Sequence, residues 1–572
     1  MTATDVKASL GPQGSAVQAA LRELSQARLL ARLWAKDHRI WRSQATEITN
    51  RLGWLTVAEQ MLEKASALQV FAKSIRDEGC RDVVLLGMGG SSLGPEVLRC
   101  TFGAAKGWPR SWVLDSTVPG AVRQVTKAIT PAKTLFLVAS KSGGTIEVMS
   151  LFMHFWKLVA EARGGRGGAQ FVAITDPATS LGELAQAKGF RTTFTNPADI
   201  GGRYSVLSYF GLVPAALLGV DMERLLRRGV EMAKRCAPAV PAHENPGAFL
   251  GTVMGLLGRG GRDKVTLVTS PKIRTFGLWA EQLLAESTGK EGKGLVPIAE
   301  EPLGAPSAYG DDRLFVYLQL QGDANAASDR HVLALERSGH PVVRLTLRDP
   351  YDLGAEFFRW EFATAVAGHF LGIHPFDQPN VQESKENTGR ILKEFQQKGR
   401  LPEIGTSWRG DGMRVVADVA AKAAPSRYLA ILAYLTPSKA VETAIAKLRR
   451  TLLSASRLPT TAGYGPRYLH STGQLHKGGT NTGLFLQLVE EMAPDVAIPG
   501  APYSFATLAR AQAVGDFQSL RAHDREVVCV TLGKDPVKAI AGMAAALSNR
   551  TTRRRITGRS KTMRATRKRT TR

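Results

Sequence analysis

The chain has 572 residues, 44% of them hydrophobic and 22% charged, which is typical of a globular protein with two to four domains. No apolar run reaches the length of a membrane span and the N-terminus lacks the pattern of a secretion signal, so a membrane or secreted protein is not expected. The net charge of +25 would suggest a nucleic-acid partner, but eleven of the Lys and Arg residues lie within 548–572, and the remaining +14 fits a protein that handles anionic metabolites.

The first 62 residues are predicted to form a helical lead. Residues 1–16 are expected to be flexible, and apolar residues at helical spacing predict helices over 17–34 and 56–76. A first domain is predicted over 63–221, where short apolar strands alternate with glycine-rich turns and helical patterns. This alternation is typical of a parallel α/β sheet covered by helices on both faces. The predicted strands are 82–86, 112–114, 134–139 and 171–174.

The first strand of this domain ends in the turn Gly87-Met88-Gly89-Gly90-Ser91-Ser92. The turn begins like the G-x-G-x-x-G of dinucleotide-binding proteins, and Asp115 ends the next strand about where a ribose-binding acid would sit. A nicotinamide-dependent dehydrogenase is therefore one interpretation. The sixth position is a serine, however, and glycines also serve to bring a helix close to a strand. We favour a small phosphate pocket that includes Gly90 and Ser91 and is shared with a second hydroxyl-rich turn two strands later.

The second turn follows an apolar strand and contains Ser140, Lys141, Ser142 and Thr145. A helical pattern starts directly after it, so hydroxyl groups, backbone N–H groups and the positive end of a helix dipole converge where an anion is stabilised. The turn lacks the G-x-x-x-x-G-K-[ST] spacing that wraps a nucleoside triphosphate, so a single terminal phosphate fits it better. The alternative is an ordinary Ser/Thr helix cap.

Two more α/β blocks are predicted, over 222–398 and 405–547, and residues 548–572 are expected to form a disordered basic tail. The tail could bind polyanions non-specifically or have no role. In the second block, strands are predicted over 264–268, 314–320 and 342–347, and helices over 222–236, 246–258, 276–286, 326–338 and 378–390. In the third block, strands are predicted over 428–434 and 527–531, and helices over 439–454 and 537–547.

Five segments resemble glucose-6-phosphate isomerases and stand in the order that this family has. They are Gly87–Pro95, Ala139–Glu147, Gly201–Ser205, Glu286–Lys290, and Pro375–Val381 with Lys385. The resemblance covers about residues 35–395 and implies two sugar isomerase (SIS) domains. The third block, with Tyr464–Gln474, resembles the extended isomerase part of bifunctional transaldolase/glucose-6-phosphate isomerases, although no transaldolase barrel is evident in this sequence.

An aldose–ketose isomerase needs a carboxylate that moves a proton between C1 and C2 of the sugar, and the resemblance implies that Glu286 has this role. Gln282 lies four residues earlier on the same helix face and is expected to bind the substrate. Arg203 would stabilise the enediolate because its charge is fixed. The resemblance implies that Lys385 contacts the ring oxygen, and Gln378, in the same predicted helix, is expected to bind the substrate. Without the resemblance, each of these charged residues could be structural or simply solvated.

The chain departs from the family at the histidine that opens the sugar ring. The family has it shortly after the base, but residues 295–317 contain no histidine. The segment around His470 resembles the histidine-containing segment of some single-function isomerases. We therefore hypothesise that the third block partly repeats the second and that His470 supplies the acid/base group, within the chain or from a partner. The alternatives are that His470 is structural, or that the group is His374, His331 or His476.

The predicted function is the reversible isomerisation of D-glucose 6-phosphate and D-fructose 6-phosphate through a cis-enediol (EC 5.3.1.9), with no metal and no other cofactor. The alternatives are a non-catalytic phosphosugar sensor on the same fold and the isomerase module of a transaldolase fusion. The expected partner is a small phosphosugar, with no membrane and no specific nucleic acid, and a homodimer is one possible assembly. Four scattered cysteines without a C-x-x-C pair indicate neither a zinc site nor disulfides, so the cytoplasm is the simplest location.

Overall fold

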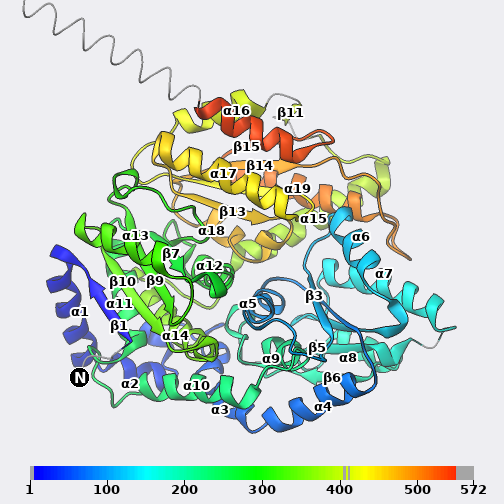
Figure 1. The fold of residues 1–572 in the computed structure, drawn as a ribbon, viewed down its shortest axis with the longest axis horizontal. Coiled ribbons are helices and arrows are strands. Elements are labelled where there is room, and N and C mark those ends of the chain that lie inside the picture. The colour runs from blue at the N-terminus through cyan, green and yellow to red at the C-terminus, as the bar shows by residue number, and fades with distance from the viewer. Residues whose placement is uncertain (1–4, 166, 404–406, 410–411, 549–572) are drawn as a thin grey trace, which may run out of the picture.

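Three five-stranded sheets organise the molecule (Figure 1). The computed structural model describes residues 5–165, 167–403, 407–409 and 412–548. Every sheet contains four parallel strands that share one order. When these four strands are numbered along the chain, the first lies between the second and the third, and the fourth lies on the other side of the third. The predicted α/β class with parallel sheets is confirmed, and the shared strand order fits the idea that the blocks are repeats.

The first sheet has the strand order β3-β2-β4-β5-β6 and is parallel throughout. Its two central strands, β2 and β4, are buried along their whole length, which is why their sequences are apolar runs rather than alternations. The strands are β2 (Asp82–Gly87), β3 (Arg110–Leu114), β4 (Thr134–Ala139), β5 (Phe171–Thr175) and β6 (Thr192–Thr195). The helices are α5 (Leu93–Phe102), α6 (Pro119–Ala128), α7 (Ile146–Ala162), α8 (Ser180–Ala187) and α9 (Tyr209–Ala216), with short 3-10 turns η4 (Gly89–Ser91) and η7 (Gly202–Tyr204).

The second sheet has the order β1-β10-β9-β7-β8. Its strands are β1 (Val6–Ser9), β7 (Lys264–Thr269), β8 (Val296–Ile298), β9 (Arg313–Leu320) and β10 (Val342–Leu347). Its helices are α10 (Met222–Arg235), α11 (Pro246–Arg259), α12 (Phe276–Thr288), α13 (Ala326–Arg337), α14 (Leu353–Leu371) and α15 (Pro379–Lys398). The N-terminal helices α1 (Gly14–Gln26), α2 (Leu29–Trp34), α3 (Trp54–Leu62) and α4 (Ala65–Asp77) precede the first sheet in the chain, and α1 packs against α11.

The prediction that residues 1–16 are flexible is wrong for 5–16, the part that the structure describes. Strand β1 pairs antiparallel with β10 at the edge of the second sheet, from Val6 opposite Leu345 to Ser9 opposite Val342. The Asp5 carboxylate forms ion pairs with Arg235 and Arg359. These partners lie more than 200 positions away in the sequence, so local sequence patterns could not reveal the strand.

The third sheet has the order β11-β15-β14-β12-β13. Its strands are β11 (Ser407–Arg409), β12 (Tyr428–Tyr434), β13 (Thr460–Tyr464), β14 (Gly483–Val489) and β15 (Glu526–Thr531). Its helices are α16 (Gly412–Ala421), α17 (Lys439–Ser456), α18 (Gly473–Gly478), α19 (Phe505–Ala522) and a last helix over 536–548, and the 3-10 turn η11 (Arg467–His470) precedes α18. Apart from Ser548, the predicted tail lies outside the described residues.

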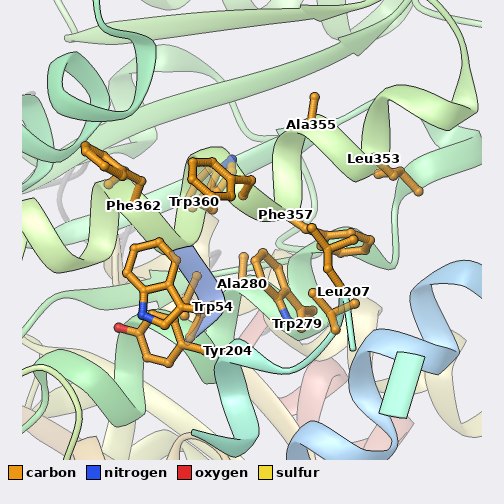
Figure 2. Packing of buried hydrophobic residues seen from close by; sticks show 14 of the residues in the cluster. Trp54, Tyr204, Leu207, Trp279, Ala280, Leu353, Ala355, Phe357, Trp360 and Phe362 are labelled. Carbon is orange, nitrogen blue, oxygen red and sulfur yellow. The ribbon is translucent and has the colours of Figure 1, made fainter. Parts of the chain in front are cut away.

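An aromatic core supports the part of the second block that faces the first (Figure 2). Helix α14 is buried on all sides and contributes Phe357, Trp360 and Phe362. The rings of Trp54 and Tyr204 stack with their centroids 5.5 Å apart. Each such buried side chain contributes about 1.5–3 kcal/mol to folding through the hydrophobic effect. Because Tyr204 follows Arg203 in η7, this core also fixes the position of that arginine.

Local sequence patterns placed several elements incorrectly. The helix predicted over 17–34 is divided into α1 and α2 because Arg28 has a left-handed backbone with φ of 50°. The patterns did not predict strands β6, β8, β13 and β14 or helices α14 and α19. Helix α14 is buried on nearly all sides and includes the buried charged residues Glu356, Arg359 and Glu361, so it lacks the one-sided periodicity that predicts a surface helix. Within the described ranges, no helix is both long and apolar enough to cross a membrane.

Candidate active site

All three blocks contribute to one cavity of about 130 Å³. Its walls are the turn before α7, one face of α15 and the turn η11. The structure thus brings together Thr145, Lys385 and His470, which are far apart in the sequence. The residues that line the cavity are Gly144, Thr145, Ile146, Glu147, Val381, Ser384, Lys385, Thr388, Gly389, Leu469 and His470.

The hydroxyl-rich turn between β4 and α7 forms one wall of this cavity. The Ser140 and Thr145 hydroxyl oxygens are 2.9 Å apart. Thr145 occupies the N-cap position of α7, but its side chain makes no capping hydrogen bond, so the first N–H groups of this 17-residue helix are not used by the cap. Ser142 is exposed, and the Lys141 ammonium pairs with Asp176. Uncapped N–H groups at a helix N-terminus are suited to an anion, so this turn, called the anion turn below, is a candidate phosphate site.

The first glycine-rich turn serves close packing against the rest of the site. A Cβ on Gly90 would lie 2.0 Å from the Gly202 carbonyl oxygen. Gly89 has a φ of 54°, and a Cβ there would lie 2.9 Å from Gln282 Nε2 and 2.7 Å from the His470 carbonyl oxygen. Ser91, the last residue of η4, is buried. These glycines let the turn approach η7, α12 and η11 at once.

Asp115, the residue that suggested a ribose contact, faces protein. Its side chain is 13% exposed, and its carboxylate lies 3.6 Å from the Arg467 guanidinium of the third block. Burial raises the pKa of Asp115, although the neighbouring Arg467 lowers it. An acid already paired inside the protein is poorly placed to bind a ribose hydroxyl, so the structure gives the dehydrogenase interpretation no support.

Glu286 and Arg203 form the centre of a buried polar cluster. The Glu286 carboxylate lies 3.4 Å from Arg203 Nη1, and their side chains are 9% and 2% exposed. Arg203 Nε donates to Ser287 Oγ at 2.7 Å, and Nη1 donates to Gln378 Oε1 at 2.7 Å. Its Nη2 donates to the carbonyl oxygens of Pro375 and Asp377 at 2.8 and 3.1 Å. The guanidinium is therefore held rigidly beside the carboxylate.

Gln282 connects Glu286 to the histidine segment. Its Nε2 donates to Glu286 Oε2 at 3.0 Å and to the His470 carbonyl oxygen at 2.8 Å. Its Oε1 is buried and has no hydrogen-bond partner among the described residues. Since buried polar atoms are nearly always paired, this oxygen is a candidate acceptor for a substrate hydroxyl.

His470 and Glu147 form a buried pair at the cavity wall. His470 Nε2 lies 2.9 Å from Glu147 Oε1, and the two side chains are 13% and 4% exposed. Burial raises the pKa of the Glu147 carboxyl, but His470 and Lys385 beside it outweigh burial, so that this pKa lies below its usual value. A carboxylate held against an imidazole orients the ring and stabilises its protonated form, as an acid/base catalyst requires.

The comparisons with known proteins agree on one family. The family model "Phosphoglucose isomerase" matches residues 56–296. The glucose-6-phosphate isomerase of Rubrobacter xylanophilus is 32% identical over 366 residues, which are 55% of this chain and 84% of that protein. The protein of the same name from Symbiobacterium thermophilum is 31% identical over 405 residues, which are 62% of this chain and 89% of that protein. The chain belongs to the glucose-6-phosphate isomerase family.

Solved structures show the fold of the family in this chain. A crystal structure of a hypothetical protein from Thermus thermophilus matches with a TM-score of 0.59 at 24% identity, over 69% of this chain and 100% of the other. A glucose-6-phosphate isomerase from Chlamydia trachomatis matches with a TM-score of 0.57 at 18% identity, over 66% of this chain and 86% of the other.

The region matched by the glucose-6-phosphate isomerase model includes the anion turn, Arg203 and Glu286, and it ends before Lys385 and His470. The structure nevertheless brings both of these residues to the cavity. Lys385 is exposed on α15, and Gln378 precedes that helix and binds Arg203. Gln474 of α18 fixes this region, because it accepts from the Asn380 backbone N–H at 2.9 Å and donates to the Gly289 carbonyl oxygen at 2.9 Å.

None of the three other candidate histidines lines the cavity of this isomerase-family site. His374 bonds to the Thr46 carbonyl oxygen at 3.1 Å. His331 lies beside Tyr309 in another part of the second block. His476 is buried against Phe485, and burial lowers the pKa of its imidazole well below the usual value. The geometry thus favours His470 among the four.

Sequence reasoning missed two residues of this site. Glu147 was part of a recognised motif, but its role depends on His470, which is 323 positions away. Gln512 of α19 donates to the same Glu147 oxygen at 2.6 Å. Gln512 stands in no recognised motif, and the motif that contains Glu147 did not indicate its partner, because these contacts form only when the first and third blocks pack together.

Proposed function

We propose that this protein interconverts D-glucose 6-phosphate and D-fructose 6-phosphate. The observation that carries the proposal is the buried pair of Glu286 and Arg203, linked through Gln282 to the cavity that contains the anion turn and His470. A carboxylate, a fixed cation, an acid/base pair and a phosphate site are the groups that this isomerisation uses. The names of the relatives, which share up to 32% identity with the chain, support the same reaction.

The phosphate of the substrate binds at the turn between β4 and α7. Ser140, Ser142 and Thr145 contribute hydroxyl groups, and the first turn of α7 contributes backbone N–H groups and the helix dipole. Ser91 and Gly90 of the neighbouring turn complete the site. Lys141 acts through its positive charge and through its ion pair with Asp176, which holds the turn.

His470, Glu147 and Lys385 open the sugar ring. The imidazole of His470 moves a proton between the ring oxygen and the hydroxyl group at C1, while the Glu147 carboxylate stabilises the protonated ring. Lys385, which also lines the cavity, donates to the ring oxygen. The open-chain aldehyde that results is the form in which the proton at C2 is acidic.

Glu286 then moves a proton between two carbons. Its carboxylate removes the proton from C2 of the aldose, the electron pair forms the double bond of a cis-enediolate, and the Glu286 carboxyl, whose proton can exchange with water, protonates C1 to give the ketose. The negative charge on the enediolate oxygen is stabilised by Arg203, whose orientation is fixed by its hydrogen bonds. Gln282 and Gln378 bind hydroxyl groups of the carbon chain.

We assign residues 63–221 and 222–398 to two SIS domains and residues 405–547 to a third α/β domain that supplies His470. Residues 1–62 form an N-terminal segment whose strand β1 joins the second sheet. A cytoplasmic location and a homodimer are parts of the same proposal, since the reaction belongs to sugar phosphate metabolism and the relatives carry the same enzyme name.

An isomerase assay coupled to a fructose 6-phosphate-consuming enzyme tests the proposal. The wild-type protein should convert glucose 6-phosphate, and Glu286→Gln should bind it with similar affinity but convert it at least ~100-fold more slowly, because the base is lost while the shape is kept. A wild-type protein that binds the sugar phosphate without converting it would instead be a sensor.

A further inference from the structure

Gln512 links the first and third blocks directly behind the acid/base pair. It lies on α19, and its side chain is 1% exposed. Its Oε1 accepts from the Thr117 hydroxyl at 2.7 Å, and its Nε2 donates to Glu147 Oε1 at 2.6 Å. Because both ends of the amide are bonded to the first block, the orientation of the Gln512 side chain is fixed.

The same Glu147 oxygen receives both Gln512 Nε2 and His470 Nε2. The described contacts of the His470 ring include no other hydrogen bond, so the Glu147 carboxylate alone sets the orientation of this ring. Glu147 is on α7 and His470 is on η11, which belong to different blocks. Gln512 is therefore the group that holds the carboxylate in place when the two blocks meet.

We propose that Gln512 is a positioning residue, which fixes the Glu147 carboxylate and thereby holds the His470 ring at the sugar cavity. This inference rests on the proposed role of His470 in ring opening. Gln512 is 1% exposed and both ends of its amide are bonded to protein groups, so it acts through Glu147 and not on the substrate. Without its N–H group, the carboxylate can rotate about its side-chain bonds, and the imidazole moves with it.

The pH dependence of activity also tests the inference, because titratable groups surround Glu147. The titratable groups that face it are His470 of η11, Lys385 of α15 and Tyr434 of β12. Gln512 is the neutral member of this cluster. Changing it to Glu keeps the shape, and because two buried carboxylates at hydrogen-bond distance do not both ionise, the new carboxyl can donate to Glu147 only while it holds a proton.

The first experiment compares two substrates. One is glucose 6-phosphate, and the other is its analogue without hydroxyl groups at C4 and C5, which cannot form a ring. In Gln512→Met, turnover of glucose 6-phosphate should fall about tenfold or more, as for a small misplacement of a catalytic group, while turnover of the open-chain analogue should change little. Equal losses on both substrates would overturn the inference.

Gln487→Met is the matched control. Gln487 is a buried glutamine on β14 that donates to the Ala513 carbonyl oxygen at 3.0 Å, next to Gln512 on α19, but it does not contact Glu147. Its substitution should lower stability without changing the ratio of the two turnover rates. If it changed the ratio as much as Gln512→Met does, α19 packing and not Gln512 would be responsible.

The second experiment is the pH profile of kcat/KM with glucose 6-phosphate. Gln512→Glu should keep the wild-type ratio of the two turnover rates at low pH and lose turnover of glucose 6-phosphate as pH rises and the carboxyl pair loses its proton, whereas a purely structural role predicts the wild-type profile. Should Gln512→Met not fold, Thr117→Val removes the hydroxyl that orients the amide and should show the same substrate bias more weakly. No bias in Thr117→Val and a wild-type pH profile in Gln512→Glu would refute the inference.

His470→Ala separates this inference from the function on which it rests. If His470→Ala discriminates between the two substrates and the Gln512 variants do not, only the role of Gln512 is wrong. If His470→Ala itself reduces both rates equally, ring opening by His470 is wrong, and the inference about Gln512 is wrong with it.

Discussion

The Arg203 guanidinium shows how a buried charge can be kept for catalysis. It is 2% exposed and uses all three of its nitrogen atoms, and its partners come from α12 and from the segment before α15. Removing such a group from water is costly unless each N–H group is satisfied, as it is here. Since the protein has already oriented these donors and acceptors, little rearrangement is needed when the enediolate forms.

His470 carries a prediction at the scale of one residue. His470→Ala removes the imidazole but not the base, so turnover of glucose 6-phosphate should fall by about 10²-fold or more, the usual contribution of a general acid/base group. Turnover of an open-chain analogue should be affected far less. Steady-state rates on both substrates check this. An equal loss on the two would exclude His470 from ring opening.

Among the short elements, we expect the turn between β4 and α7 to decide substrate affinity. Thr145→Val keeps the shape of the side chain but removes the hydroxyl that bonds to Ser140. A hydrogen bond to a charged group contributes about 1.5–3 kcal/mol, so KM for glucose 6-phosphate should rise at least ~10-fold, with a smaller change in kcat. Competitive inhibition by inorganic phosphate should weaken in parallel.

Ser438→Ala is the control for this prediction. Ser438 is a true N-cap, whose side chain accepts from the Val441 N–H at 3.2 Å at the start of α17. Its loss should cost about 1 kcal/mol of stability and leave KM unchanged. If KM rose equally in both variants, the β4–α7 turn would be only a structural cap.

Helix α12 carries a second buried acid beside the site residues. Glu281 accepts from the Ala299 backbone N–H at 3.2 Å, and burial raises the pKa of its carboxyl to about 8, although Arg449 of the third block opposes the rise. Because the folded protein keeps a proton that the unfolded chain has lost, the stability from this group is complete below its usual value of 4.5 and is lost as pH rises toward 8.

Glu281→Gln should therefore reduce the pH dependence of stability. Glutamine has the same shape, can still accept from the Ala299 N–H, and does not ionise. Relative to the wild-type protein, the melting temperature of the variant should rise between about pH 5 and pH 8.5, by roughly 2 °C or more. Melting curves across this range check the prediction, and a constant difference between the two proteins would contradict it.

At the scale of the whole molecule, the first sheet alone provides the anion turn, and the other two blocks bring groups to it. Figure 1 shows α12, α18 and α5 together near the middle, and α12 contacts both α18 and α5 across the blocks. In the third sheet, protein groups fill the edge that corresponds to the one with the anion turn. There the Thr436 backbone N–H donates to Glu490 at 2.8 Å, and a Cβ on Gly120 of α6 would lie 1.8 Å from Thr436 Oγ1.

Because the third block contributes His470 to the cavity, we expect activity to be lost on heating when this block unfolds. The Lys477 ammonium and the Asp516 carboxylate are 2.6 Å apart and 0% and 1% exposed. Lys477→Met leaves the acid buried without its counter-charge, which costs about 3–5 kcal/mol. The half-life of activity at elevated temperature should shorten strongly. The surface pair of Lys422 and Glu526 is the control, because Lys422→Met should cost about 1 kcal/mol or less.

Sequence patterns predicted the parts of the molecule that local chemistry specifies. The strand, hydroxyl turn and helix around Ser140 were recognisable, as were the ordered motifs that contain Arg203 and Glu286. Strand β1 could not be predicted, since ion pairs of Asp5 with distant arginines fix it. The Glu147–His470 pair and its support by Gln512 were equally hidden, because these contacts exist only after the first and third blocks have packed.

The most direct test of the account is exchange of the C2 proton of glucose 6-phosphate in heavy water, followed by NMR. The wild-type protein should introduce deuterium at C2 and C1 during isomerisation. Glu286→Gln should introduce none, yet it should still accelerate the exchange between the α and β anomers, because His470 and the anion turn are intact. Deuterium at C2 at the wild-type rate in Glu286→Gln would contradict the central claim that this carboxylate moves the proton.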